Sequence, residues 1–304
     1  MEGTYDDGEK TKHWVFWLPN GNKDFEGSFI ASLRNGLWTF YSDSTGNKSY
    51  EGFYNNDLRH GEWTFWYLNK EVWKKGDYLN GKKEGLWRYF NEEKKLVMQG
   101  KYKMGKEEGE WKSWYDSGEK KDLGNFTNGL MTGKWMGWFE GGQKNYKGTY
   151  QKGLKDGLWE HWYANGQQEL MDAYLVKTKE IKSYLKEDSK KYASFTKSQL
   201  ISVREGPHFS WYDNGQIKDE GHYKNNLQNK TWTYYFKDGK KMYEQTFVHG
   251  KQEGKVKEWY AIGTLKSVKN YTHNLPNGKW IFYEKEAGKV KKTLHFKNGK
   301  KVEK

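Results

Sequence analysis

Aromatic residues and glycines alternate with polar residues along this chain in a pattern that returns about every 24 residues. A Gly-x-Trp step marks the register most clearly, and it lies at Gly36/Trp38, Gly61/Trp63, Gly85/Trp87, Gly109/Trp111, Gly133/Trp135 and Gly157/Trp159. The same register continues at Gly206, Lys230, Gly254 and Gly278 and reaches back to Lys12. A fixed period of this length is typical of repeat proteins, whose units stack to bury one continuous core.

Each period contains two segments that favour short strands. The segment 61–67 is rich in aromatic and β-branched residues, and the segment that ends in Gly76-Asp77-Tyr78 predicts a second strand. Turn dipeptides suited to hairpins separate such segments at Asn20-Gly21, Asn128-Gly129, Asn165-Gly166, Asn214-Gly215, Asp238-Gly239 and Asn298-Gly299. We therefore predict an all-β fold, an elongated, twisted, single-layer antiparallel β-meander of about twelve β-hairpin repeats.

The offsets between glycines and aromatic residues predict a strand register in which each ring lies across from a glycine. Such a pairing leaves room for the ring and covers the bare backbone. The predicted pairs are Tyr54–Gly61, Gly52–Trp63, Tyr78–Gly85 and Gly76–Trp87. On this basis we assign a structural role to Gly61, Trp63, Gly85, Trp87, Gly109, Trp111, Gly133, Trp135, Gly157 and Trp159.

A second aromatic residue follows each Trp position by three residues. Alternation along a strand predicts that it lies on the opposite face of the sheet, often among polar neighbours such as Thr64. This row comprises Trp17, Tyr41, Trp66, Phe90, Trp114, Trp138, Trp162, Trp211, Tyr235, Trp259 and Tyr283. Because Trp and Tyr dominate interaction hot spots, we predict partner binding by Trp66, Trp114, Trp138, Trp162, Trp211 and Trp259. The alternative is that the second face is also packed, for instance if the sheet curls over itself.

The repeat is interrupted between Gly157 and Gly206, which lie two periods plus one residue apart. Residues 177–205 are rich in Lys and Ser, so we divide the chain into an N-terminal array (1–176), a degenerate repeat or insertion (177–205) and a C-terminal array (206–304). The segment 191–196 resembles a repeat strand and favours a hairpin. The spacing of Ile181, Tyr184 and Leu185 also suits a short helix.

Composition limits the class of protein. The mean hydropathy of −1.18 is low, but aromatic residues make up 18% of the chain, which indicates a folded protein with a thin aromatic core. The net charge of +13 permits an acidic partner, although lysines spread along the chain also keep an extended sheet from aggregating. There is no Cys, which excludes disulfides, thiolate metal sites and Cys nucleophiles but does not indicate a compartment. There is no apolar run long enough to span a membrane and no visible signal peptide, so we expect a cytoplasmic protein. The chain begins in the middle of a repeat, which leaves room for an upstream leader.

No catalytic or metal-binding motif is recognisable. Phosphate-binding loops, nucleophile elbows, His-Glu-x-x-His and EF-hand patterns are absent, and the eight histidines are scattered, with His60, His161 and His208 at repeat positions that hold other residues elsewhere. We therefore expect no enzyme activity, no metal, no cofactor and no small-molecule substrate. An enzyme would need a deep cleft, which a single-layer sheet rarely supplies.

The units, such as Asn80-Gly-Lys-Lys-Glu-Gly-Leu-Trp-Arg-Tyr-Phe90, resemble MORN-type repeats. The longer spacing is similar to the variant class of bacterial YwqK-type, antitoxin-like proteins, and the resemblance covers about 270 of the 304 residues. It departs from the pattern at Lys12 and Lys230 in the Gly position and at His208 and Val256 in the Trp position. The resemblance implies protein–protein scaffolding, phospholipid binding in eukaryotic members and toxin neutralisation in bacterial ones, without a defined set of site residues.

Two functions follow as hypotheses. The first is a non-catalytic scaffold that binds a protein partner along the sheet, with antitoxin-like neutralisation of that partner as one form of this function. The second is binding of an anionic surface, either phospholipid or nucleic acid, because basic and aromatic residues alternate along the chain.

Overall fold

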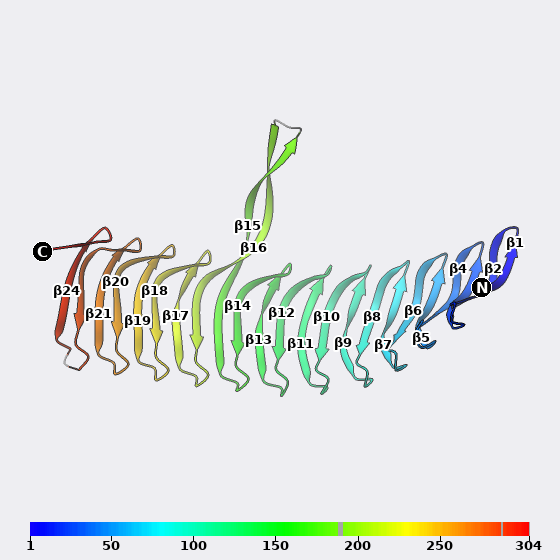
Figure 1. Cartoon of the computed structure of the whole chain (residues 1–304), viewed down its shortest axis with the longest axis horizontal. Helices are drawn as coiled ribbons and strands as arrows, with labels where there is room; N and C mark the ends of the chain where they lie inside the picture. Colours follow the sequence, from blue (N-terminus) through cyan, green and yellow to red (C-terminus); the bar gives the residue numbers. More distant parts are fainter. Residues whose placement is uncertain (188–190, 287, 304) are drawn as a thin grey trace. The chain divides into compact units, whose positions relative to one another are not determined.

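The computed structural model describes residues 1–187, 191–286 and 288–303, and in this part of the chain the regular elements are all β-strands. The chain forms two compact units, Met1–Gly142 and Gln143–Lys304. In each unit, successive strands pair antiparallel in chain order and form a sheet one layer thick (Figure 1). The predicted all-β meander of hairpins is therefore confirmed. The boundary between the compact units, at Gly142, is distinct from the break in the repeat at 177–205.

Unit 1 contains twelve strands, each of which pairs with the next along the chain. They are β1 (Glu2–Asp6), β2 (Glu9–Trp17), β3 (Lys23–Ile30), β4 (Leu33–Tyr41), β5 (Lys48–Asn55), β6 (Leu58–Trp66), β7 (Val72–Leu79), β8 (Lys82–Phe90), β9 (Leu96–Lys103), β10 (Lys106–Trp114), β11 (Lys120–Thr127) and β12 (Leu130–Trp138).

Unit 2 follows the same plan, except for two much longer strands, β15 and β16. Its strands are β13 (Lys144–Gln151), β14 (Leu154–Trp162), β15 (Gln168–Glu187), β16 (Lys191–Trp211), β17 (Ile217–Lys224), β18 (Leu227–Tyr235), β19 (Lys241–Val248), β20 (Lys251–Trp259), β21 (Leu265–Thr272), β22 (Leu275–Pro276), β23 (Gly278–Tyr283), β24 (Val290–Lys297) and β25 (Lys300–Val302).

Two kinds of turn alternate along each sheet. Tight turns such as Asn128-Gly129 have positive φ at both residues, 51° and 80°, which is the two-residue hairpin turn that matches the twist of the strands. The turns at the other strand ends are longer, and in Asn214-Gly215 only the glycine has positive φ. There the Asn214 side chain accepts a hydrogen bond from the Gln216 N–H at 3.1 Å and donates to the Lys237 carbonyl of the next turn at 2.9 Å. Side chains thus join consecutive long turns.

The Gly-x-Trp step forms a bulge. Gly61 has φ of +63°, a conformation that glycine adopts at little cost. In the register of β5 with β6, Gly52 pairs with Trp63 and Phe53 pairs with His60, so that Gly61 and Glu62 are skipped. The predicted Gly52–Trp63 pair is confirmed.

The predicted tyrosine–glycine pairs are wrong in register. Tyr54 lies across from Arg59 on β6 and from Gly36 on β4. In the next period, Tyr78 lies across from Lys83 on β8 and from Gly61 on β6. Each tyrosine does face a glycine, but it is the glycine of the preceding strand, because the bulge shifts the pairing on the following one.

The bulge also leaves the Phe53 carbonyl free for the Trp63 indole, whose Nε1 donates to it at 3.0 Å. The indole ring covers Gly52 so closely that a Cβ there would lie 2.3 Å from the ring. The same bond to the carbonyl ten residues upstream recurs in both units, from Trp14, Trp38, Trp87, Trp111, Trp135, Trp159, Trp232 and Trp280 to Thr4, Ser28, Asp77, Lys101, Asn125, Thr149, His222 and Asn270. We call this unit of bulge, glycine and indole the Trp lock.

The core of unit 1 is a row of such locks. Trp38, Trp63 and Trp87 are at most 1% exposed, and they pack with Tyr54 and Tyr78. The Tyr54 and Trp63 rings meet edge to face at 5.1 Å, a favourable geometry for aromatic pairs. Of the other residues with a predicted structural role, Trp111, Trp135 and Trp159 are also buried, at 7%, 7% and 2% exposure.

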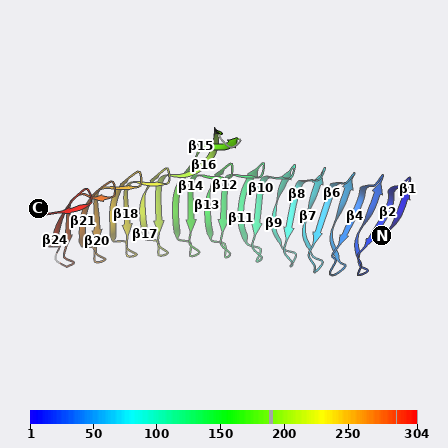
Figure 2. The same cartoon turned by 45° about the horizontal axis from the view of Figure 1, so that its top comes forward.

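The break in the repeat forms a long hairpin that extends away from the row of strands in unit 2 (Figures 1 and 2). β15 pairs with β14 only as far as Tyr174, and β16 pairs with β17 only from Gly206. Between these points β15 and β16 pair with each other, from Leu175–Val203 to Glu187–Lys191. Of the two predicted alternatives, the described residues of 177–205 therefore form the hairpin and not the helix.

Candidate interaction surface

The aromatic row predicted from the sequence lies at the ends of strands, next to the longer turns. In unit 1, Trp66, Trp114 and Trp138 are the last residues of β6, β10 and β12. In unit 2, Trp162, Trp211 and Trp259 end β14, β16 and β20. All six side chains are partly exposed.

Contacts of two tyrosines in the row place them on the face opposite the Trp locks. Tyr41 donates to Glu26, and Tyr235 donates to Glu220 at 2.6 Å. Glu26 and Glu220 each precede a glycine that a Trp ring covers, and successive side chains in a strand point to opposite faces. Burial and the hydrogen bond to Glu220 raise the pKa of Tyr235 to about 12, so it remains a neutral donor at physiological pH.

Lysines from neighbouring strands partly cover the rings of this row. Lys23 Nζ lies 5.9 Å from the Trp17 ring and 5.8 Å from the Tyr41 ring. The same contact brings Lys48 to Trp66, Lys144 to Trp162 and Lys241 to Trp259, at 5.8, 5.7 and 5.7 Å. Each such contact contributes about 0.5–1 kcal/mol at an exposed site. A lysine side chain, and not a second layer of sheet, thus partly covers these rings.

The lysines are held in place by glutamates on the same face. Lys23, Lys48 and Lys241 each lie within 2.8 Å of the glutamate three residues further along, Glu26, Glu51 or Glu244. Lys241 and Lys257 both bond Glu244 and keep its pKa below the usual range. The face therefore combines aromatic rings with both signs of charge.

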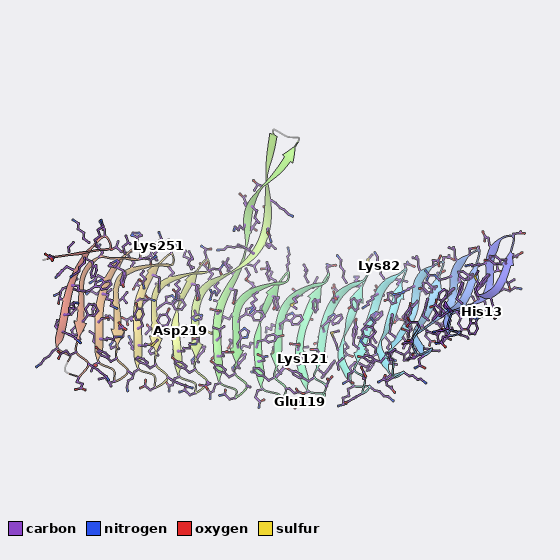
Figure 3. The ribbon with its side chains drawn as sticks, viewed as in Figure 1. His13, Lys82, Glu119, Lys121, Asp219 and Lys251 are labelled. Atoms are coloured by element: carbon purple, nitrogen blue, oxygen red, sulfur yellow. The ribbon has the colours of Figure 1, made fainter. Side chains whose placement is uncertain are left out.

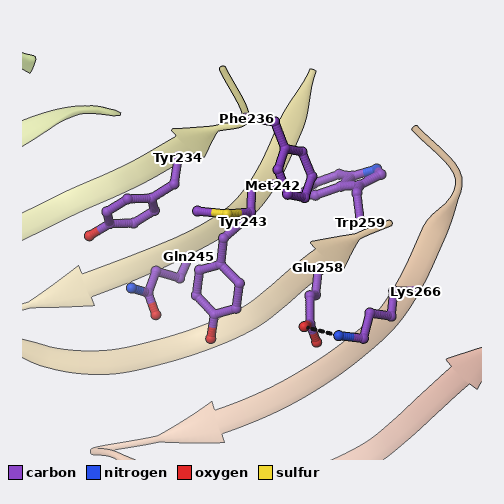
Figure 4. Close-up of a pocket in the computed structure, with 8 residues that line it drawn as sticks. All are labelled: Tyr234, Phe236, Met242, Tyr243, Gln245, Glu258, Trp259 and Lys266. Atoms are coloured by element: carbon purple, nitrogen blue, oxygen red, sulfur yellow. Dashed lines mark hydrogen bonds and ion pairs between the residues drawn. The ribbon is translucent and has the colours of Figure 1, made fainter. Parts of the chain in front are cut away.

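In unit 2 the turn ends of the strands also contain hollows built from equivalent repeat positions. One, of about 470 Å³, is bordered by Tyr234, Phe236, Met242, Tyr243, Gln245, Glu258, Trp259 and Lys266 (Figure 4). A second, of about 440 Å³, lies one repeat further on and is bordered by Tyr260, Lys266, Phe282, Tyr283, Lys291, Lys292 and Leu294. A third, of about 330 Å³, is bordered by His161, Tyr163, Glu169, Leu170, Ser210, Trp211 and Lys218. Trp211 and Trp259, two of the predicted partner-binding residues, thus line concave sites.

The two units differ sharply in charge. Residues 143–304 hold 32 of the 53 Lys and Arg and 18 of the 40 Asp and Glu, a net charge of +14, whereas residues 1–142 hold 21 and 22, a net charge of −1. The interpretation that the positive charge is spread along the chain is therefore wrong at the scale of the units. Within each unit the charged side chains lie at both ends of the strands, as Lys82 and Lys121 illustrate in unit 1 (Figure 3).

One polar cluster was missed by the sequence analysis. His208 occupies a Trp position on β16, and Asp172 occupies the glycine position across from it on β15. His208 Nδ1 lies 2.7 Å from Asp172 Oδ1, and His208 Nε2 lies 2.8 Å from Asp219 Oδ1. The His208 ring stacks on the Trp232 ring at 5.0 Å. We call this arrangement, at the base of the long hairpin, the His lock.

The His lock is built to hold a charged imidazole. Burial alone would lower the pKa of His208, but the hydrogen bonds that its ring donates to Asp172 and Asp219 outweigh burial and raise the pKa to about 9. The same partnership lowers the pKa of Asp219. Ser210 donates to Asp219 at 2.5 Å and not to His208. Because both ring nitrogens donate to carboxylates, His208 has no free nitrogen to accept a proton from a nucleophile.

Among the residues that the structure describes, no group of three or more His, Asp or Glu side chains is placed to hold a metal ion. No helix there has the length and apolar character that crossing a membrane requires.

Comparison with known proteins identifies the repeat. Four segments, residues 59–80, 107–128, 204–225 and 228–249, match the MORN repeat variant family. The chain therefore carries MORN-variant repeats, which are generally protein-binding and typically non-catalytic. The matched segments include strands of both units. No curated protein matches the chain.

Among solved structures, the crystal structure of TcdB2-TccC3 without its hypervariable C-terminal region is similar at 8% sequence identity. The alignment covers 94% of this chain and 20% of that chain, with a TM-score of 0.17. A likeness at this score carries no argument about function.

Proposed function

We propose that this chain is a non-catalytic repeat scaffold that binds a partner protein through the aromatic row. The observation that carries the proposal is the recurrence of an at least partly exposed aromatic residue at the same strand end of successive repeats, with lysine side chains over several of the rings, such as those of Trp66 and Trp259. Such rings bury apolar surface when a partner binds, and aromatic residues dominate interaction hot spots. The protein-binding character of MORN repeats supports the same conclusion.

The test is capture of partners by two forms of the full chain. One form is unchanged, and in the other Trp66, Trp114, Trp138, Trp162, Trp211 and Trp259 are replaced by Thr, which keeps strand propensity. We expect a partner protein that is retained by the first form and lost by the second, with both giving the same far-UV circular dichroism. A control form, with the exposed Leu37, Phe53 and Leu158 replaced by Thr, should retain the partner. Equal capture by all three forms would contradict the proposal.

We further propose an antitoxin-like role for the scaffold, in which the bound partner is a toxic protein held inactive. The long row of rings supports this role, because covering a large surface of a partner blocks its own binding sites. The genetic test is deletion. The gene should be dispensable only in cells that also lack a neighbouring toxin gene, and a viable single deletion would remove this role.

Binding of anionic phospholipid or nucleic acid is the second candidate. The net charge of +14 in residues 143–304 favours it. Binding through that charge should fall steeply with salt, because released counterions supply the free energy. Flotation with phosphatidylserine vesicles and titration with single-stranded DNA, each at low and high salt, test it. Weak binding that is insensitive to salt would exclude it.

The cytoplasmic location and the absence of a cofactor or small-molecule substrate remain predictions. Cell fractionation tests the first. Mass spectrometry of the purified chain under native conditions tests the second, because a tightly bound small molecule would add a discrete mass.

A further inference from the structure

Two neighbouring hollows of unit 2 repeat at a fixed distance along the sheet. The hollow around Tyr243 and Trp259 and the hollow around Phe282 share Lys266 at their common edge. Equivalent residues in them are one repeat apart and therefore two strands apart. Since strands in a sheet are about 4.8 Å apart, the hollows are spaced at roughly 9.6 Å.

This spacing selects one conformation for a chain that crosses the strands and fills both hollows. A polyproline II helix rises about 3.1 Å per residue with three residues per turn, so that every third side chain returns to the same side after about 9.3 Å. An α-helix has a rise of about 1.5 Å per residue and would need six or seven residues per hollow. In a β-strand, the residue three positions on is about 10 Å away but points to the opposite side. An α-helix returns a side chain to the same face after seven residues, or about 10.5 Å, so the polyproline II segment matches the spacing more closely and delivers one side chain to each consecutive hollow.

The walls of the hollows select apolar side chains. Tyr243 is half-buried, and in Figure 4 it stands with Tyr234, Met242 and Trp259 around the same space. Aromatic-lined grooves are the surfaces that polyproline II segments dock against, because the segment is already extended and loses little conformational entropy.

Lysines at the rims of the hollows favour acidic residues at those positions of a bound polyproline II segment that do not enter a hollow. Lys291 and Lys292 border the second hollow, are exposed, and form no ion pair within the described residues. In the first hollow, Lys266 lies 2.6 Å from Glu258. Unit 2 as a whole carries +14. Glu258 lines the first hollow itself, which disfavours a phosphate inside it and favours an uncharged side chain there.

We propose that unit 2 binds an acidic, proline-rich segment of a partner protein, in the polyproline II conformation and across the strands, with an apolar side chain from every third residue in successive hollows. This inference rests on the proposed scaffold function and names the chemistry of its partner. The hollows lie on strands β18 to β24, so the contact does not require the long hairpin or unit 1.

The experiment uses the full chain and synthetic peptides, with binding followed by isothermal titration calorimetry. The test peptide repeats Leu-Pro-Glu five times, and the control peptide has one additional Ser in each repeat, which keeps the numbers of Leu, Pro and Glu and the net charge but changes the period from three to four. We expect the test peptide to bind at least about tenfold more tightly than the control peptide. Equal affinities, or no binding of the test peptide, would overturn the proposal.

Variants locate the contact. Tyr243→Ala removes a wall of the first hollow and should weaken binding about tenfold or more. Because this change can loosen the sheet, Lys291→Glu with Lys292→Glu provides an independent test at exposed positions, with a similar loss expected. Leu37→Ala, at an exposed apolar position of unit 1 outside the aromatic row, should leave the affinity unchanged. Loss of binding in Leu37→Ala but not in the unit 2 variants would contradict the assignment.

A single-stranded oligothymidylate separates the peptide from a nucleic acid. It should not displace the test peptide at equal concentration, and displacement would overturn the proposal in favour of an anionic polymer. Failure of the peptide leaves the scaffold function standing, because that function is tested by the six Trp→Thr replacements.

Discussion

The two units solve the same packing problem in different ways. In unit 1, Trp63 fills the space above Gly52 and donates to the Phe53 carbonyl. At the equivalent position in unit 2, His208 replaces the indole and Asp172 replaces the glycine, and the contact becomes ionic. The exchange occurs where β15 and β16 leave the sheet as a long hairpin. The Trp lock depends on burial and on a hydrogen bond between uncharged groups, whereas the His lock depends on the charge of its members and is therefore sensitive to pH.

The two units also differ in the net charge of their surfaces. Unit 1 is nearly neutral and has a nearly continuous aromatic core, whereas unit 2 carries +14. Hollows occur at the turn ends of both units, since Tyr41 and Trp66 border one of about 350 Å³ in unit 1. One repeat can therefore supply binding surfaces of different charge on the same kind of sheet. The predictions below test this division, from the largest expected effect to the smallest.

Removing an aromatic lock should have the largest effect on stability. Trp63→Ala opens a cavity beside Tyr54 and Tyr78 and leaves the Phe53 carbonyl without its donor, so we expect a loss of about 3–5 kcal/mol in the free energy of unfolding. Urea denaturation followed by circular dichroism measures it. Trp66→Ala, a partly exposed ring, is the matched control and should cost about 1 kcal/mol. Similar losses in the two variants would show that the lock is not the source of stability.

Breaking the His lock should lower the free energy of unfolding by nearly as much as removing Trp63. His208→Asn leaves the charges of Asp172 and Asp219 buried without compensation, and we expect a loss of about 3–5 kcal/mol. The double variant Asp172→Gly with His208→Trp rebuilds the lock of unit 1 in unit 2. It should recover stability to within about 1 kcal/mol of the unchanged chain. A double variant as unstable as the single one would mean that the two locks are not interchangeable.

The His lock should make the stability of unit 2 sensitive to alkaline pH. The Trp lock of Trp63 should have no such effect. The folded pKa of His208 is about 9, above the value of 6.5 for the free side chain, so its stabilisation is complete below pH 6.5 and is lost as pH rises towards 9. The full contribution is about 3 kcal/mol. The lowered pKa of Asp219 adds a second loss at acidic pH, as that carboxylate protonates.

Two measurements check this prediction. The imidazole proton resonance that is missing in His208→Asn gives the pKa directly, and a value near 6.5 would refute the assignment. The double variant Asp172→Gly with His208→Trp should lose the alkaline dependence of the unfolding free energy.

The smallest effect concerns the glycine of the bulge. Lys230 occupies this position in unit 2 with φ of +62°, where Gly61 of unit 1 has +63°. A side chain in this conformation costs about 1 kcal/mol, so Lys230→Gly should stabilise the chain by that amount and raise its melting temperature. Lys75→Gly, in the middle of β7 where Lys75 pairs with Thr64 and Arg88, should lower it instead, because glycine loses more backbone entropy. The same sign for both substitutions would contradict the role of the bulge.

The sequence predicted the parts of the fold that depend on local pattern. The period, the strands, the tight turns and the pairing of Gly52 with Trp63 follow from the spacing of glycine and aromatic residues. The pairing of Tyr54 was wrong because alternation assumes that residues face each other one to one, and a glycine with positive φ inserts a bulge. Positive φ cannot be read from a glycine alone.

The candidate site was predictable only in part. The aromatic row follows from the register, but its lysine cover depends on side-chain conformations, and the hollows depend on how the turns pack. The His lock required the pairing across an insertion of unknown structure. Its one signal in the sequence was the coincidence of His208 in a Trp position with Asp172 in the matching glycine position, 36 residues apart.

The Trp lock has a consequence for how such proteins change length. Its hydrogen bond joins two residues ten positions apart, well within one period, so each lock is encoded by a single stretch of gene. Insertion or deletion of a whole period would leave an intact Trp lock on each side of the junction. Insertion or deletion of half a period would separate the two residues of one Trp lock. The number of repeats can thus change during evolution in steps of one period, and the length of the binding surface can change with it while each remaining Trp lock is preserved.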